Sequence, residues 1–350
     1  MTMGLSDTKA VRREKRRILD RFARHISKGQ VRYLRCAHLD MQEEARSGIK
    51  FVDKESGRAV IDAFTSAGCF NVGRGNARVI AALERALDGR DMGSFGLLSR
   101  AKIEFAAKLV SLCPGDMKRM LFAGSGGDAI DGAIKLALGA TGRREVISMV
   151  KAYHGHVGFA LSANGKEYYR HLFEPLMPDF KFTPFGDLAA VEKIASPSTA
   201  AIILEPVQGE GGIHVADEGY LRGLRRLCDA HGIMLIFDEI QTGFCRTGKL
   251  WASEHSGVVP DIMTLAKSIS GGLYPNAAIV YRDIKPLVKF VEDNPGFHPV
   301  SSGGSDLGCL VSSAVLDVIV EDRIWENAAK MGERFKAGLE DITRENPSIV

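Results

Sequence analysis

The chain has 350 residues, of which 45% are hydrophobic and 25% are charged, as in an ordinary globular protein with one large and one smaller domain. A net charge of +3 is too near neutral to indicate a nucleic-acid partner, and no apolar run approaches the roughly 18 residues of a membrane span. Six scattered cysteines without a CxxC pair argue against a zinc site or a disulfide framework. We expect a cytoplasmic protein that binds no metal, nucleic acid or membrane.

The first 35 residues are rich in arginine and have the pattern of an amphipathic helix. Ile18, Phe22 and Ile26 recur at every fourth position, so they share one helical face. Acidic residues interrupt the basic run, whereas a transit peptide is poor in acids. We expect this helix to dock on the body of the protein or on a neighbouring subunit; the alternative is an arm for a membrane or a nucleic acid.

A small antiparallel hairpin is predicted over residues 50–63, where two apolar stretches flank a turn at Ser56-Gly57. Beyond residue 76, Val79, Leu83 and Leu87 follow at helical spacing. From there, short apolar runs alternate with amphipathic helical stretches up to long helical segments over 310–344. The apolar runs are 120–123, 146–150, 201–204, 234–237, 262–266 and 277–281.

This alternation predicts an α/β fold, with a mostly parallel sheet covered by helices on both faces. Ligands of such sheets lie at the carboxyl ends of the strands. The residues directly after each apolar run are therefore the candidates for chemistry.

The first candidate is the glycine-rich turn from Gly124 to Ala129, between a predicted strand and a helix. Glycines allow the backbone to approach an anion, and a helix N-terminus offers free N–H groups, so a phosphate or pyrophosphate is the natural ligand. The turn also matches the GxGxxA dinucleotide fingerprint, with Glu145 about 20 residues further on. However, Glu145 precedes its strand, whereas a ribose-binding acid should follow it.

Asp238 and Lys267 each follow an apolar run. A carboxylate at the end of a buried strand needs a partner. A lysine at such a place is partly desolvated, which frees its amine as a nucleophile. Pyridoxal phosphate needs an anion cradle, an amine for its aldehyde and an acid for its pyridine nitrogen, so the three features fit this one cofactor.

Five segments resemble the motifs of the class III aminotransferases, which include acetylornithine, ornithine and 4-aminobutyrate aminotransferases. They occur in family order and spacing: Glu205-Pro206-Val207-Gln208-Gly209-Glu210-Gly211-Gly212, Phe237-Asp238-Glu239-Ile240-Gln241-Thr242-Gly243, Arg246-Thr247-Gly248-Lys249, Pro260-Asp261 and Ala266-Lys267-Ser268-Ile269-Ser270-Gly271-Gly272. The resemblance runs from about residue 50 to 345. It implies fold type I and a homodimer with active sites at the subunit interface.

The resemblance assigns roles to the matching residues. Lys267 matches the lysine that holds the cofactor as a Schiff base and moves the proton between the substrate Cα and the cofactor, and Asp238 matches the partner of the pyridine nitrogen. The other implied cofactor contacts are the phosphate turn Ser125, Gly126 and Gly127, the ring-stacking Tyr153 with His154, Glu205, Gln241 near the phenolic oxygen, and Ser301, which would reach the phosphate of the other subunit. Glu210 matches an acid that often pairs with an arginine and releases it to a substrate carboxylate.

Three segments depart from the family pattern. The usual Ser-Gly-Thr/Ser-Glu turn is Ser125-Gly126-Gly127-Asp128, so one phosphate-binding hydroxyl is missing. The segments 301–306 and 73–77 are also altered. Family members continue into a C-terminal domain that commonly supplies an arginine for the substrate carboxylate, whereas this sequence stops at Val350.

The sequence thus predicts an N-terminal helix and small-domain segment over 1–70, a large cofactor domain over 71–315, and over 316–350 the incomplete start of a C-terminal small domain. We expect an aminotransferase that moves an amino group between an amine or amino acid and a 2-oxo acid. A racemase, epimerase or decarboxylase with the same cofactor is the first alternative. A nicotinamide-dependent dehydrogenase and a catalytically inactive binding protein are more remote ones.

Overall fold

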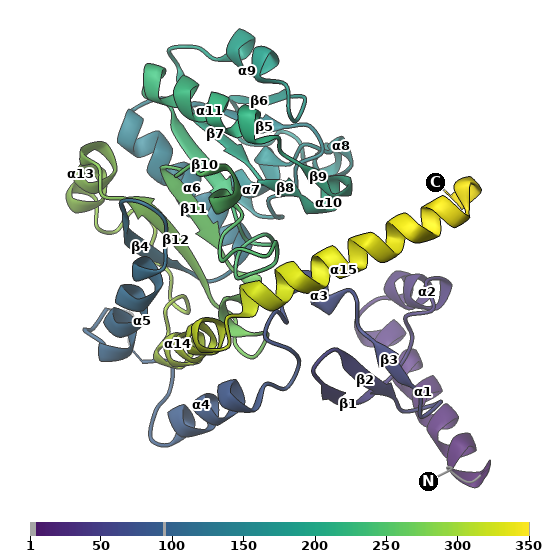
Figure 1. The fold of residues 1–350 in the computed structure, drawn as a ribbon. Helices are drawn as coiled ribbons and strands as arrows, with labels where there is room; N and C mark the ends of the chain where they lie inside the picture. Colours follow the sequence, from purple (N-terminus) through teal and green to yellow (C-terminus); the bar gives the residue numbers. More distant parts are fainter. Residues whose placement is uncertain (1–4, 94–95, 350) are drawn as a thin grey trace. The chain divides into compact units, whose positions relative to one another are not determined.

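The computed structural model describes residues 5–93 and 96–349, which fall into two compact units. The first unit is Met1–Thr65 with Gly73–Asn76, and the second is Ser66–Val72 with Ala77–Val350. Each unit has its own secondary structure (Figure 1).

The first unit consists of two helices and a three-stranded antiparallel sheet in the order β1-β2-β3. Its elements are α1 (Leu5–His25), α2 (Lys28–Cys36), β1 (Glu43–Ser47), β2 (Lys50–Asp53) and β3 (Ala59–Ile61). The predicted hairpin is confirmed, because β2 and β3 pair around the turn at Ser56-Gly57. The predicted amphipathic helix is also confirmed as α1, which ends one residue before Ile26.

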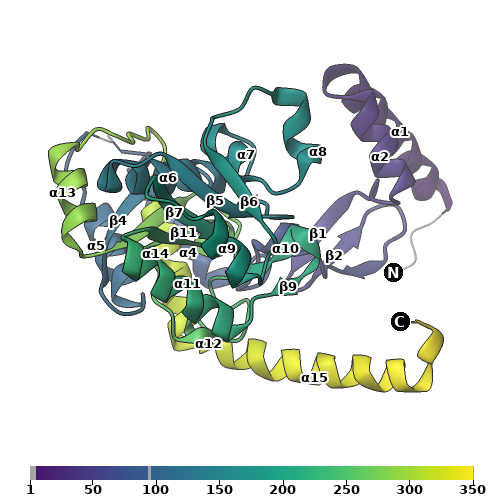
Figure 2. The same cartoon turned by 90° about the horizontal axis from the view of Figure 1, so that it is seen from above.

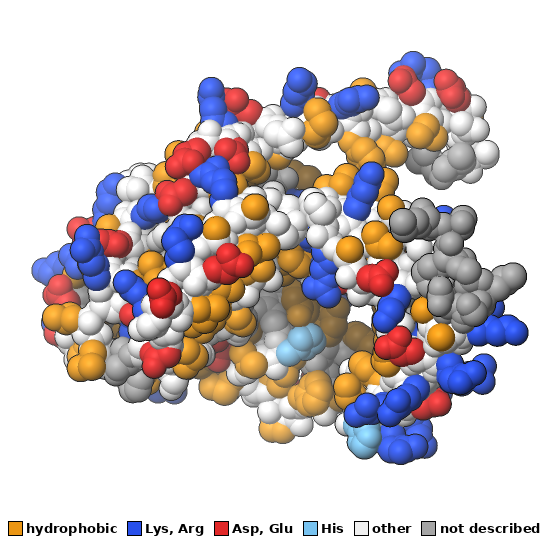
Figure 3. Space-filling model, turned by 90° about the horizontal axis from the view of Figure 1, so that it is seen from below, with side chains coloured by type: hydrophobic (Ala, Val, Ile, Leu, Met, Phe, Trp, Pro, Cys, Tyr) orange, Lys and Arg blue, Asp and Glu red, His pale blue; other side chains and the backbone are white. Residues whose placement is uncertain are grey.

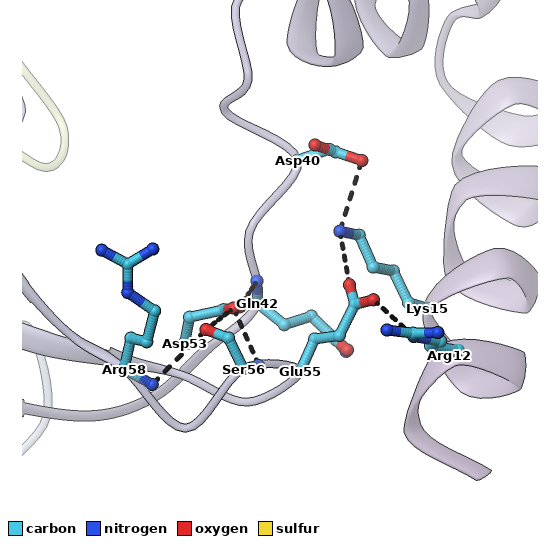
Figure 4. A network of polar contacts seen from close by, with 8 residues as sticks. All are labelled: Arg12, Lys15, Asp40, Gln42, Asp53, Glu55, Ser56 and Arg58. Atoms are coloured by element: carbon cyan, nitrogen blue, oxygen red, sulfur yellow. Dashed lines mark hydrogen bonds and ion pairs between the residues drawn. The ribbon is translucent and has the colours of Figure 1, made fainter. Parts of the chain in front are cut away.

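Ion pairs hold α1 on the hairpin of its own unit (Figure 4). Lys15 Nζ lies 2.8 Å from a Glu55 carboxylate oxygen and 3.3 Å from one of Asp40, and Arg12 Nε lies 3.1 Å from Glu55. Asp53 orders the turn, since its carboxylate accepts hydrogen bonds from the Ser56 hydroxyl and the backbone N–H of Gln42. The basic face of α1 is therefore used in part to fix the helix to the hairpin.

The second unit is built on a seven-stranded sheet in the order β4-β12-β11-β10-β7-β5-β6. Its strands are β4 (Met117–Ala123), β5 (Glu145–Met149), β6 (Phe180–Thr183), β7 (Thr199–Leu204), β10 (Met234–Asp238), β11 (Ile262–Leu265) and β12 (Ala277–Arg282). All neighbouring pairs are parallel except those of β12 with β11 and β4. The mostly parallel sheet predicted from the sequence is confirmed, and every predicted apolar run forms a strand.

Helices cover both faces of this sheet because its central strands are apolar on both sides (Figure 2). In β10, Ile236 packs with the residues of α6, whereas Leu235 and Phe237 pack on the opposite face with those of α11. The long helices of the unit are α4 (Ala77–Leu87), α5 (Arg100–Ser111), α6 (Gly126–Thr141), α11 (Glu218–His231), α13 (Lys285–Asp293), α14 (Asp306–Glu321) and α15 (Ile324–Glu345).

Short elements make up the connections: α3 (Thr65–Gly68), α7 (Gly158–Ala163), α8 (Glu167–Arg170), η1 (His171–Phe173), α9 (Leu188–Ile194), β8 (Val207–Gln208), α10 (Gly209–Gly212), β9 (His214–Val215), α12 (Ser253–Ser256), η2 (Lys267–Ser270) and η3 (Pro347–Ile349). Helix α15 has no buried residue, and hydrophobic side chains stand exposed among charged ones on the face in Figure 3. Within residues 5–93 and 96–349, no helix is long and apolar enough to cross a membrane.

Candidate active site

The carboxyl ends of the parallel strands meet at one cavity of about 440 Å³ in the second unit. This is the edge at which open α/β sheets bind their ligands. Of the eleven predicted site residues, ten line the cavity: Ser125, Gly126, Gly127, Tyr153, His154, Glu205, Glu210, Asp238, Gln241 and Lys267. Ser301 is exposed and does not line it.

The N-terminus of α6 forms one end of the cavity. Ser125 is the N-cap, and its hydroxyl accepts a hydrogen bond from the Asp128 N–H over 3.2 Å. The N–H groups of Gly126 and Gly127 belong to the first turn, where a helix has no partner for them, so they are available to an anion. A Cβ at 127 would lie 3.0 Å from Val157 Cγ2, which shows that little room exists for a side chain there.

Asp238 and His154 form a buried pair at the floor of the cavity. Asp238 is the last residue of β10 and is 4% exposed, and one of its carboxylate oxygens lies 2.8 Å from His154 Nδ1. The His154 N–H of the backbone donates to Asn164 Oδ1, which fixes the residue from behind. His154 Nε2 is buried without a hydrogen-bond partner among the described residues. Such an unpaired buried polar atom is expected where a bound group completes the site.

Lys267 also lines the cavity, and it opens η2 two residues after the end of β11. Its backbone has φ 47°, a left-handed conformation that a non-glycine residue adopts only when its surroundings hold it. The next residue supplies part of that hold, because the Ser268 hydroxyl donates to the Gly68 carbonyl over 2.6 Å. The amine of Lys267 is therefore presented from a fixed position.

Glu205 and Tyr153 both line the cavity, and a hydrogen bond joins them. Glu205 accepts hydrogen bonds from the backbone N–H groups of Tyr153 and Gly209, each over 3.1 Å. Burial, together with the nearby Asp238 carboxylate, raises the pKa of Glu205 to about 7, although the neighbouring His154 opposes the shift.

This raised pKa predicts a pH-dependent stability of the cofactor-free protein. Folded Glu205 keeps its proton up to about pH 7, whereas the unfolded residue loses it near 4.5. The folded state therefore binds more protons between these values, and the free energy of unfolding should fall by up to about 1.4 kcal/mol per pH unit as the pH rises. Urea denaturation between pH 5 and 7.5 should show this slope, and Glu205→Gln should remove it. Glu192 is exposed on α9, so the control variant Glu192→Gln should keep the wild-type slope. A Glu205→Gln variant with the same slope as the wild type would contradict the assignment.

Gln241 lines the cavity and contacts residues far from it in the sequence. Its amide donates to the Ala67 carbonyl over 3.1 Å, and its oxygen occupies the place of a Cβ at 209, only 1.6 Å away. Glu210 lines the same cavity.

Sequence reasoning missed several lining residues, notably Cys69, Tyr274 and Asn276, which no apolar run or motif marks.

Comparison with known proteins gives the family. The model of the family "Aminotransferase class-III" matches residues 37–350. An uncharacterized aminotransferase from Archaeoglobus fulgidus is 41% identical over 334 residues, which are 95% of this chain and 78% of that protein. The chain belongs to the class III aminotransferases, and it is a pyridoxal-phosphate-dependent aminotransferase of fold type I.

Solved structures of transaminases have the same fold. A thermostable (S)-enantioselective omega-transaminase from Thermomicrobium roseum is similar with a TM-score of 0.87 and 28% identity, over 98% of this chain and 81% of that one. A taurine:2-oxoglutarate aminotransferase from Bifidobacterium kashiwanohense, in complex with pyridoxal phosphate and glutamate, has a TM-score of 0.82 and 26% identity, over 87% of this chain and 73% of that one.

The cavity fits this cofactor on its own geometry. Free helix N–H groups, a buried carboxylate–imidazole pair with an unpaired nitrogen, and a fixed lysine surround one space. The dehydrogenase alternative fails, because the fingerprint acid Glu145 lies at the opposite end of β5. There its carboxylate accepts from Ser196 and lies 2.9 Å from Lys181 Nζ.

Proposed function

We propose that Lys267 is the residue that binds the cofactor's aldehyde and later moves the proton. Lys267 lines the same cavity as Asp238, at the start of η2, where its φ of 47° is strained. When bound, pyridoxal phosphate withdraws electrons from the substrate Cα, which no side chain of the protein can do. With the cofactor bound, Lys267 Nζ would be the base that takes the proton from the substrate Cα and later gives it back.

Asp238 would pair with the cofactor's pyridine nitrogen in this proposal. Its carboxylate would hold the proton there, which keeps the ring electron-withdrawing. His154 lies behind it at 2.8 Å and orients the carboxylate. Tyr153 also lines the cavity, and we propose that its ring stacks on the face of the cofactor ring.

The phosphate would lie at the N-terminus of α6, on the N–H groups of Gly126 and Gly127 with the Ser125 hydroxyl beside them. We further propose a homodimer in which Ser301 of one subunit reaches the phosphate of the other. The exposure of Ser301 and its place outside the cavity of its own chain support this assignment. Sedimentation equilibrium should give twice the chain mass, and Ser301→Ala should weaken cofactor binding without changing that mass.

The family's phosphate-binding hydroxyl is missing at position 127, where this chain has Gly127, and this leads to a prediction about cofactor binding. Gly127→Ser alone should not improve cofactor binding, because its Cβ would press on Val157. The double variant Gly127→Ser with Val157→Ala should bind pyridoxal phosphate roughly three- to tenfold more tightly, the range of one added hydrogen bond. Equilibrium titration of the cofactor-free protein measures this, with Val157→Ala as the control. No gain over that control would show that position 127 does not face the phosphate.

The proposed substrates are an amine or amino acid as donor and a 2-oxo acid as acceptor, with Glu210 at the substrate end of the cavity. We place the protein in the cytoplasm, with the domain division at 70 and 315 that the sequence predicts. Convergence of Lys267, Asp238 and the α6 N-terminus on one cavity carries the proposed roles.

Mixing the loaded protein with an amino donor and no 2-oxo acid tests the reaction. An aminotransferase with this site should convert its cofactor stoichiometrically to pyridoxamine phosphate and stop. Racemisation or loss of carbon dioxide without that conversion would instead indicate a racemase or a decarboxylase. Absence of all three would support an inactive binding protein.

A further inference from the structure

The side chain of His298 is buried against α6, with only 5% of it exposed. A Cβ at Gly132 of this helix would lie 2.7 Å from His298 Cδ2 and 2.8 Å from Nε2, so the ring packs directly on the helix and has little room to move. Nε2 lies 3.4 Å from Asp128 Oδ1 but has no hydrogen-bond partner among the described residues. A buried ring nitrogen without a hydrogen bond requires a physical explanation.

Asp128 connects this ring to the glycine-rich turn at the cavity. Its Oδ2 accepts a hydrogen bond from the Gly124 N–H over 2.8 Å, and its own N–H donates to the Ser125 hydroxyl over 3.2 Å. Gly124 and Ser125 line the cavity, whereas Asp128 does not. Asp128 therefore closes the turn from behind and fixes its shape.

The Asp128 carboxylate also places a negative charge next to the proposed phosphate site. The N-terminus of a helix carries a partial positive charge, which stabilises an acid in the first turn and would attract a phosphate in the same way. The carboxylate and a phosphate at this turn would share that positive charge and repel each other. A cation beside Asp128 would remove the repulsion, and the basic side chain that lies there is His298.

We propose that His298 is a positioning residue for the cofactor's phosphate and that it acts through Asp128. With a phosphate at the turn, the ring takes up one proton from solvent, and the imidazolium then offsets the charge of Asp128. The neutral ring still packs on α6 but leaves the repulsion in place. Phosphate binding is therefore coupled to proton uptake, an inference that rests on the proposed cofactor site.

The charged groups of α6 that face His298 set the direction of the pH dependence. Burial lowers the pKa of His298 from its ordinary 6.5; Asp128 and Asp131 oppose this shift, and Lys135 adds to it. Asp131 is turned to α7, where it accepts from the Ala160 N–H over 2.9 Å. The ring is thus mostly neutral at pH 7 before binding, and a nearby phosphate raises its pKa. The contribution of His298 to affinity is present at low pH and is lost as the pH rises through the pKa of the bound state.

Equilibrium titration of the cofactor-free protein with pyridoxal phosphate at pH 6 and pH 8.5 tests this coupling. His298→Gln should weaken binding roughly tenfold at pH 6, the lower end of the range for a hydrogen bond to a charged group, and less than about twofold at pH 8.5. Asp128→Asn keeps an acceptor for the Gly124 N–H but removes the charge. In that background His298→Gln should change binding less than about twofold at both pH values.

His231→Gln is the control, because His231 is exposed at the end of α11 and does not line the cavity. An equal loss at both pH values would show that His298 only packs on α6, and no loss at pH 6 would remove it from phosphate binding; either result overturns the proposal. The same variants are titrated with inorganic phosphate, which needs no amine, and followed by thermal unfolding. If phosphate binding depends on His298 in this way but no cofactor can be trapped on Lys267, the proposed function fails and the role of His298 is supported.

Discussion

Replacing Lys267 by alanine should lower the rate of amino transfer by at least roughly 10³-fold, since the variant loses both the amine that binds the cofactor and the group that moves the Cα proton. The loss should appear in the single-turnover reaction with an amino donor, because both functions belong to that half-reaction. The fold should remain, because Lys267 forms no ion pair among residues 5–93 and 96–349 and its backbone is held through Ser268.

Lys289→Ala is the matched control for this variant. Lys289 is exposed on α13 and pairs with Asp293 of the same helix, so its removal should leave the rate unchanged. Circular dichroism and thermal unfolding should show the same fold for both variants. A Lys267→Ala enzyme that keeps more than a tenth of the wild-type rate would remove Lys267 from the chemistry.

Replacing Asp238 by asparagine should lower the single-turnover rate by roughly 10²–10³-fold, because the side chain keeps its shape but loses the charge that stabilises the protonated ring nitrogen. Asp238 is buried, so solvent does not screen this interaction. Cofactor content should stay near that of the wild type, since the phosphate and Lys267 ends are intact. Stopped-flow absorbance with an amino donor separates the rate from the content.

His154→Gln provides a graded comparison for the Asp238 variant. It removes the imidazole at 2.8 Å but leaves the carboxylate, so the expected loss is smaller, about tenfold. Exposed Asp293→Asn is the neutral control. If Asp238→Asn reacts as fast as the wild type, the carboxylate has no electronic role and only fills the floor of the cavity.

The sequence predicted the sheet because its central strands are apolar on both faces. Every residue of β7, β10 and β11 is buried, so these strands appear in the sequence as continuous apolar runs, which can be recognised without tertiary information. Four of the described strands were missed: β8 and β9 have only two residues each, and β1 and β6 lack a continuous apolar run. Every residue of β1 is exposed, and β6 is a four-residue edge strand with Lys181 in it, so neither has a continuous apolar signal.

The candidate site was predictable where its residues follow strands. Asp238 is the last residue of β10 and Lys267 lies two residues after the end of β11, and these positions alone predict a role for both residues. Contacts across long sequence distances were not predictable in this way. The bond of His154 to Asp238 joins residues 84 positions apart. Cys69 reaches the cavity from the segment Ser66–Val72, which is held by side-chain hydrogen bonds such as that of Gln241 to the Ala67 carbonyl.

The central claim is that Lys267 is the residue that binds pyridoxal phosphate. The most direct test is to load the protein with the cofactor, reduce it with borohydride, digest it and locate the modified peptide by mass spectrometry. We predict a single modified peptide that contains Lys267, and no modified peptide from the Lys267→Ala variant. Modification of another lysine, such as Lys151 or Lys166, or a protein that binds no cofactor would contradict the account.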